Sequence, residues 1–65
     1  MKVLNLERNN LEQLEENVFA GLVNLKQLYL ARNRLVLIDP KAFRALRQLE
    51  ILDLKSNRLR DFFVC

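Results

Sequence analysis

The leucines of this chain recur at intervals that fit neither one helix nor one strand. In the segment LKQLYLARNRL an asparagine, Asn33, lies among four leucines, Leu25, Leu28, Leu30 and Leu35. An amphipathic helix needs apolar residues at i, i+3, i+4 and i+7, and a half-buried strand needs strict alternation. The segment matches neither pattern, but it superimposes on the chain before it and the chain after it when position 25 is aligned with positions 1 and 49. The spacing therefore indicates tandem repeats that begin at these three positions.

The repeat extends over the whole chain of 65 residues. Its early aligned positions are Leu4/Leu28/Leu52, Leu6/Leu30/Leu54, Asn9/Asn33/Asn57 and Leu11/Leu35/Leu59. Its later aligned positions are Leu14/Ile38/Phe62, Phe19/Phe43 and Leu22/Leu46. We interpret residues 1–65 as one unit made of repeats 1–24 and 25–48 and a partial repeat 49–65.

Each repeat is expected to form one coil of a solenoid. The segments LNL (4–6), LYL (28–30) and LDL (52–54) are predicted to be short strands, in which successive side chains point to opposite faces. The chain must then turn and return one layer higher, so successive strands pair into a parallel sheet. One such coil cannot bury its leucines alone, and neighbouring coils complete the core.

The asparagine of each repeat has a predicted structural role. The chain holds one Gly and one Pro, so it must bend after each strand without the usual turn residues. Such a bend leaves buried backbone groups without partners, which is costly. An inward carboxamide can donate to these groups and accept from them. We expect a structural ladder of Asn9, Asn33 and Asn57, and a surface turn role is the alternative.

The second half of each repeat carries helical spacing. Phe43 and Leu46 are an i, i+3 pair, and Asp39 followed by Pro40 suits a helix cap and first turn. A short helix or helical turn is therefore expected at 40–46, with a looser equivalent at 16–22. Phe19 and Phe43 are expected to stack. The predicted fold class is an α/β solenoid, with a short parallel sheet on one face and loops and short helical turns on the other.

These residues resemble the leucine-rich repeat of the "typical" type, with the pattern LxxLxLxxNxLxxLxxxxFxxLxx. Residues 25–48 fit throughout, residues 1–24 fit with Met1 in the first leucine position, and residues 49–62 fit its first part. The resemblance implies a curved solenoid with its sheet on the concave face, used as a binding scaffold. It also implies an extracellular or cell-surface receptor or matrix protein, as in toll-like receptors of innate immunity and small leucine-rich proteoglycans, and a cytoplasmic location is the alternative.

The chain lacks the cysteine-rich caps of extracellular members, and Cys65 is its one cysteine. An uncapped solenoid exposes the apolar interior of its end coils. We therefore expect a fragment of a longer solenoid. Self-association through the uncapped ends is an alternative.

Function is expected on the outward side chains of the strands and of the loops that follow them. This concave surface carries an aromatic residue, both signs of charge and an apolar residue. Tyr29 with Arg32 resembles the aromatic and Arg anchors of protein interfaces, although Tyr29 as a simple cover of the sheet is the alternative. The predicted partner-binding residues are Asn5, Glu7, Gln27, Tyr29, Arg32, Ile51, Asp53 and Lys55.

The charge of +3 is distributed unevenly along the chain. Residues 1–24 carry two basic and four acidic side chains, and residues 25–65 carry nine basic and four acidic ones. A basic cluster is expected near the strand ends, formed by Arg32, Arg34, Lys55, Arg58 and Arg60. Its alternatives are a solvated rim, a sulfated-glycan site and an acidic-protein site. Nucleic acid is disfavoured, because Tyr29 is the one outward aromatic residue available for base stacking.

Catalysis is not expected. The sequence has no His, no Gly-rich phosphate loop and no serine or cysteine with an evident activating base. No metal, cofactor or small-molecule substrate is predicted, and no apolar run approaches the length of a membrane span. The sequence therefore predicts a module that binds a protein ligand without membrane contact. The competing interpretation is that these coils only extend a longer receptor or matrix protein.

Overall fold

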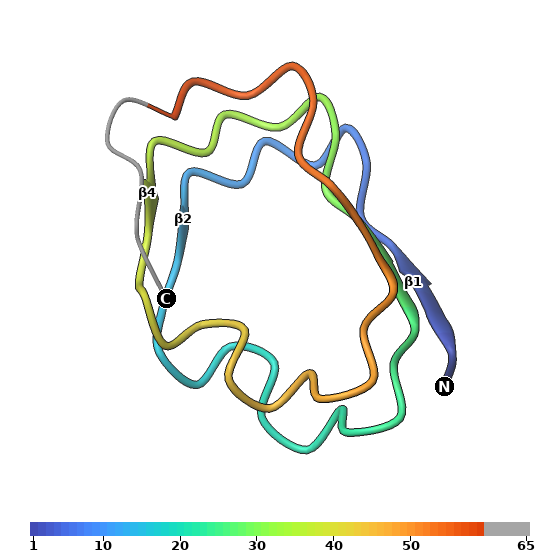
Figure 1. The fold of residues 1–65 in the computed structure, drawn as a ribbon. Coiled ribbons are helices and arrows are strands. Elements are labelled where there is room, and N and C mark those ends of the chain that lie inside the picture. The colour runs from blue at the N-terminus through green and yellow to red at the C-terminus, as the bar shows by residue number, and fades with distance from the viewer. Residues whose placement is uncertain (60–65) are drawn as a thin grey trace.

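The computed structural model describes residues 1–59, which wind in stacked coils around a common interior (Figure 1). One side of the coils is a three-stranded sheet in the order β1-β3-β5, formed by β1 (Val3–Asn5), β3 (Gln27–Tyr29) and β5 (Ile51–Asp53). Both strand pairs are parallel, which confirms the predicted sheet, although each strand begins and ends one residue earlier than the predicted 4–6, 28–30 and 52–54. The expectations for Arg60, Phe62 and Cys65 lie outside the described residues.

The sheet register reproduces the sequence repeat. Leu28 of β3 lies opposite Leu4 of β1 on one side and Leu52 of β5 on the other, so each strand pairs with its equivalent in the next repeat. Backbone hydrogen bonds continue past the strand ends in the same register, from Leu6 N–H to Tyr29 O and from Leu30 N–H to Asp53 O, both 2.8 Å long. Repeat-equivalent residues are therefore direct neighbours in space.

A second sheet, which the sequence did not predict, holds the coils together on the opposite side. It pairs β2 (Gln13–Leu14) with β4 (Leu37–Ile38) in parallel, with Leu14 opposite Ile38 (Figure 1). Hydrogen bonds from Val36 N–H to Glu12 O and from Asp39 N–H to Leu14 O, both 2.9 Å long, flank the paired residues. Strand pairing on two sides fixes adjacent coils about 4.8 Å apart.

Of the two forms expected at 40–46 and 16–22, a short helix or a helical turn, the structure has turns, since residues 1–59 contain no helix. Residues 16–21 and 40–45 instead form successive turns closed by hydrogen bonds to the third residue back, such as Leu46 N–H to Phe43 O at 3.0 Å. An i, i+3 spacing fits such turns as well as an α-helix. Helices pack about 8–10 Å apart, whereas two sheets hold these coils about 4.8 Å apart, so stacked helices do not fit. Asp39 still acts as a cap, because its Oδ1 accepts from Lys41 N–H at 2.8 Å.

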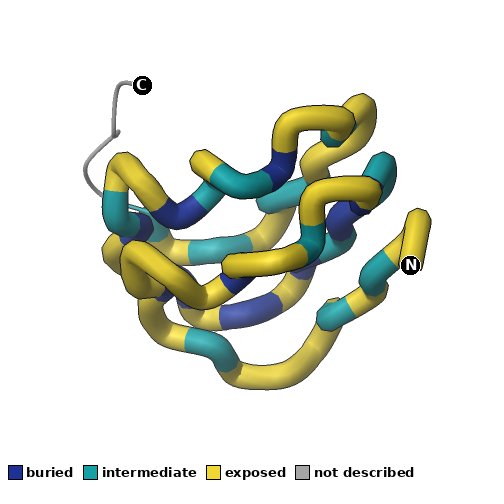
Figure 2. The backbone as a smooth tube through the Cα atoms, turned by 90° about the horizontal axis from the view of Figure 1, so that it is seen from below, coloured by how far each residue is buried: buried dark blue, intermediate teal, exposed yellow. Residues whose placement is uncertain are grey.

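The core lies between the two sheets and is most complete in the middle coil. Leu25, Leu28, Leu30 and Leu35 are fully buried, whereas Leu52 in the last described coil is 38% exposed. Figure 2 shows the same contrast, with the N-terminal strand in the colours of exposed and intermediate residues. The middle coil is covered by a neighbour on each side, as expected for a repeat that buries its apolar residues against adjacent repeats.

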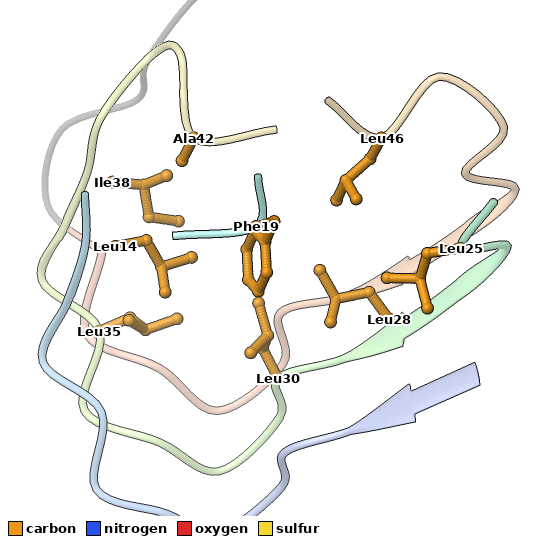
Figure 3. Packing of buried hydrophobic residues seen from close by; sticks show 9 residues of the cluster. All are labelled: Leu14, Phe19, Leu25, Leu28, Leu30, Leu35, Ile38, Ala42 and Leu46. Atoms are coloured by element: carbon orange, nitrogen blue, oxygen red, sulfur yellow. The ribbon is translucent and has the colours of Figure 1, made fainter. Parts of the chain in front are cut away.

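Phe19 and Phe43 stack as expected at the turn side of the core. Their ring centroids are 5.9 Å apart and the ring planes differ by 11°. Figure 3 shows Phe19 in the middle of the interior, with Leu14 and Ile38 on one side and Leu28 and Leu46 on the other. The rings therefore connect the turn segments of the first two coils.

The corners after the strands are made by residues in the left-handed conformation. Arg8, Arg32 and Ser56 occupy equivalent repeat positions and have φ angles of 59°, 58° and 57°. Non-glycine residues adopt positive φ uncommonly. The chain thus turns each corner at a fixed position of the repeat without glycine.

Candidate functional site

The candidate site is the outer face of the β1-β3-β5 sheet and the loops that follow the strands. Strand register places Gln27 between Val3 and Ile51, and Tyr29 between Asn5 and Asp53. Neighbours within each row are about 4.8 Å apart. The structure therefore brings five of the eight predicted partner-binding residues together on the strands themselves, namely Asn5, Gln27, Tyr29, Ile51 and Asp53.

Tyr29 is held in one orientation at the centre of this face. Its hydroxyl donates to Gln27 Oε1 at 2.7 Å, and both side chains are half-buried. Residues two apart in a strand share a face, so this contact lies along β3 itself. The ring is therefore oriented before any partner arrives.

Asn5 and Asp53 flank Tyr29, and each is tied to the loop after its own strand. Asn5 Oδ1 accepts from Glu7 N–H at 2.9 Å, and Asp53 Oδ1 accepts from Lys55 N–H at 3.0 Å. Asn and Asp commonly hydrogen-bond the backbone two residues on in this way. This role was not predicted, although an Asn or Asp two residues before a loop residue is a sequence signal for such a turn.

The loops after the strands present the remaining predicted residues, Glu7, Arg32 and Lys55, all exposed to solvent. Ala31 occupies the same repeat position as Glu7 and Lys55 but is only 6% exposed. Its methyl group is short, and its carbonyl accepts from Arg8 N–H of the preceding coil at 3.2 Å. Adjacent coils thus close over Ala31, which contributes no contact surface.

The repeated asparagines serve the backbone rather than this surface. Asn33 is 5% exposed, and its Oδ1 accepts from Asn9 N–H at 2.9 Å and from Leu11 N–H at 3.0 Å. Its Nδ2 lies within hydrogen-bond distance of Leu6 O, Leu30 O and Ala31 O. Asn57 likewise bonds the coil before it, accepting from Leu35 N–H and donating to Leu30 O, both at 3.0 Å. Exposed Asn9 donates to Glu7 O at 3.0 Å within its own coil.

A group of cations lies beside the strand ends. Arg32 N–H bonds Lys55 O and Arg58 N–H bonds Leu35 O, both at 2.9 Å, which places these basic residues on adjacent coils. Arg32, Arg34, Lys55 and Arg58 are all exposed. The ion pair found within residues 1–59 is elsewhere, between Lys26 Nζ and Glu50 Oε2 at 3.9 Å.

Residues 1–59 show neither a metal site nor a membrane-spanning helix. No group of three or more His, Cys, Asp or Glu side chains is arranged to hold a metal ion there. Nor does this part of the chain contain a helix able to cross a membrane.

Comparison with known proteins gives one result. A leucine-rich-repeat family model matches residues 1–61. No curated protein and no solved structure matches significantly. Domains of this family generally act in protein–protein recognition, are typically non-enzymatic, and occur in both extracellular and intracellular proteins. The match covers residues 1–61 of the 65 residues of the chain, so the chain belongs to the leucine-rich-repeat family.

Proposed function

We propose that the chain is a protein-recognition module that binds a protein partner through the outer face of the β1-β3-β5 sheet. This face corresponds to the concave surface of the sequence prediction. The observation that supports the proposal most is the position of Tyr29, oriented by Gln27 at the centre of a surface with apolar and charged neighbours. The pairing of each strand residue with its equivalent one repeat later also supports the "typical" subtype. An extracellular location stays a prediction from the resemblance.

Tyr29 has the properties of an interface anchor. Aromatic residues and Arg are enriched among the residues that dominate binding energy, and such anchors cluster near the centre of an interface. The hydrogen bond to Gln27 reduces the side-chain freedom that Tyr29 loses on binding, which lowers the entropic cost. Arg32, exposed at the corner after the same strand, supplies the charged anchor.

Two exposed apolar side chains lie in the row of the sheet next to Tyr29. Val3 is 51% exposed and Ile51 is 43% exposed, and both lie in the row of Gln27. A partner that covers Tyr29 also removes these two side chains from water, which favours binding. The charged residues Glu7 and Lys55 lie beyond the strand ends and select the partner by complementary charge.

A peptide-display selection tests the proposal without a known partner. Random peptides of about twelve residues are selected on the wild-type chain, and each binder is then measured against the double variant Tyr29→Ala/Arg32→Ala. We expect most binders to lose at least about tenfold in affinity, because an interface anchor typically contributes about 2 kcal/mol or more. Far-UV circular dichroism should be unchanged, since both side chains point away from the core.

The matched control is Val36→Ala/Arg47→Ala. It also removes one apolar and one basic exposed side chain, but neither belongs to the sheet face or to the group of cations beside the strand ends. Binders should retain their affinity for this control. Equal loss on both double variants, or no loss on the first, contradicts the choice of the sheet face as the binding surface.

A further inference from the structure

A groove of about 250 Å³ lies between the turn segments of the first two coils, away from the sheet face. Its lining includes three pairs of repeat-equivalent residues: Asn17/Lys41, Ala20/Arg44 and Val23/Arg47. Equivalent residues of adjacent coils therefore form its two walls. The wall from the first coil has the apolar side chains of Ala20 and Val23 beside the polar Asn17 and Glu16, and the wall from the second coil is basic.

The backbone aligns part of each wall. In both coils one turn closes by a hydrogen bond to the third residue back, from Ala20 N–H to Asn17 O and from Arg44 N–H to Lys41 O, both 3.1 Å long. Side chains three residues apart in such a turn lie close to one line, about 6 Å apart. Arg47 follows a tighter turn, in which its N–H bonds Ala45 O at 2.9 Å, so Lys41 and Arg44 are the aligned cations of this wall.

These three cations are exposed and have no carboxylate partner within residues 1–59, where the ion pair found joins Lys26 and Glu50. Glu16 is the acidic residue of the lining. Ala42, which is buried, and the half-buried Ala45 also line the groove. The groove therefore combines three cations on one wall with small apolar side chains on the floor and on part of the other wall.

We propose that this groove is a second docking site, which binds an extended acidic peptide segment of a partner protein. In an extended peptide, residues two apart share a face and lie about 6.6 Å apart, close to the spacing of Lys41 and Arg44. Alternating Glu or Asp residues pair with Lys41 and Arg44, and Arg47 adds positive charge to the same wall. The intervening apolar residues point to the opposite wall, against Ala20 and Val23. A flat membrane surface has no segment that enters a groove of this shape.

Fluorescence anisotropy with a labelled Glu-Val-Glu-Val-Glu peptide, at low salt, tests the proposal. The reversal variant Lys41→Glu/Arg44→Glu should bind at least about tenfold more weakly, because two charge-paired contacts become repulsive. The matched control Arg34→Glu/Arg58→Glu makes the same change of net charge on exposed residues outside the groove and should stay within about twofold of wild type. The neutral peptide Gln-Val-Gln-Val-Gln should bind at least about tenfold more weakly to wild type.

A second variant separates the groove from charge alone. Ala20→Glu places a carboxylate opposite Arg44, on an exposed position of the apolar wall, and should weaken binding of the acidic peptide several-fold with unchanged circular dichroism. Tyr29→Ala/Arg32→Ala should leave peptide binding unchanged, so the two surfaces are tested independently.

Three outcomes overturn the proposal. Equal weakening by both reversal variants indicates non-specific attraction to a basic protein. Tighter binding to vesicles of phosphatidylcholine with one-quarter phosphatidylserine than to the peptide indicates a membrane surface. Self-association in light scattering that Lys41→Glu/Arg44→Glu abolishes indicates that a second copy of the chain occupies the groove.

Discussion

Asn33→Ala should remove a large part of the stability of the described fold. The carboxamide of Asn33 is buried at the corner after β3, where it contacts five backbone groups: Asn9 N–H, Leu11 N–H, Leu6 O, Leu30 O and Ala31 O. Two of these carbonyls keep another donor, since Leu30 O accepts from Asn57 Nδ2 and Ala31 O from Arg8 N–H. The remaining three groups, Asn9 N–H, Leu11 N–H and Leu6 O, lose the hydrogen-bond partner that Asn33 provides.

The size of the effect follows from these three groups. A buried polar group without a partner costs about 1–3 kcal/mol, and partial access of water places these part-buried groups near the lower limit. Asn33→Ala should therefore cost about 3–4 kcal/mol. A domain of this length has a free energy of unfolding of about 3–10 kcal/mol. The variant should therefore lose between about one third and all of its free energy of unfolding at about 25 °C.

Urea titration followed by far-UV circular dichroism measures this cost. With a slope of about 1 kcal/mol per molar urea, the midpoint should fall by about 3 M. If no folded baseline remains in water, titration with trimethylamine N-oxide recovers it. The control is Asn9→Ala, which removes one exposed hydrogen bond to Glu7 O and should cost about 0.5 kcal/mol. A midpoint for Asn33→Ala no lower than that of Asn9→Ala refutes the structural role of the buried carboxamide.

Three further predictions follow from the core, a corner and the surface. Phe19→Ala should cost about 3–5 kcal/mol in a urea titration, because the ring is 3% exposed and stacks in the core, whereas Val18→Ala at a 49% exposed position should cost less than about 0.5 kcal/mol. Ser56→Gly should raise the thermal unfolding midpoint, because it removes about 1 kcal/mol of backbone strain from the left-handed conformation of this residue. Ser56→Val should lower the midpoint, and a midpoint higher for the Val variant than for the Gly variant refutes this account of the corner. Glu50→Gln should change the free energy of unfolding by less than about 0.5 kcal/mol, because the pair with Lys26 is exposed and 3.9 Å long; a larger loss at low salt refutes this.

The sequence alone determined which residues become neighbours. A repeat of fixed length places each residue beside its equivalent in the next coil, so the rows of the sheet and the Phe19–Phe43 stack could be predicted. The apolar positions of the repeat also identified the core residues. The buried role of Asn33 followed from the scarcity of glycine and proline at the bends.

The tertiary structure decided the conformation of the backbone between the repeat-equivalent core residues. A three-residue spacing at Phe43 and Leu46 is compatible with a helix or with successive turns, and the close distance between coils selects the turns. The β2–β4 pairing that enforces this distance joins equivalent residues of adjacent repeats and has no strand signal of its own. The burial of Ala31 depends on adjacent coils in the same way.

Both surfaces proposed for binding combine these two contributions. The sequence predicted the row that holds Tyr29, but only the structure showed that Gln27 orients its ring. The spacing of Lys41 and Arg44 places them on one face in a turn or a helix, but the groove between the turn segments depends on how adjacent coils pack, which the sequence did not predict. Periodicity fixes which side chains are adjacent, whereas the conformation of the backbone between them depends on contacts with other coils that no local pattern encodes.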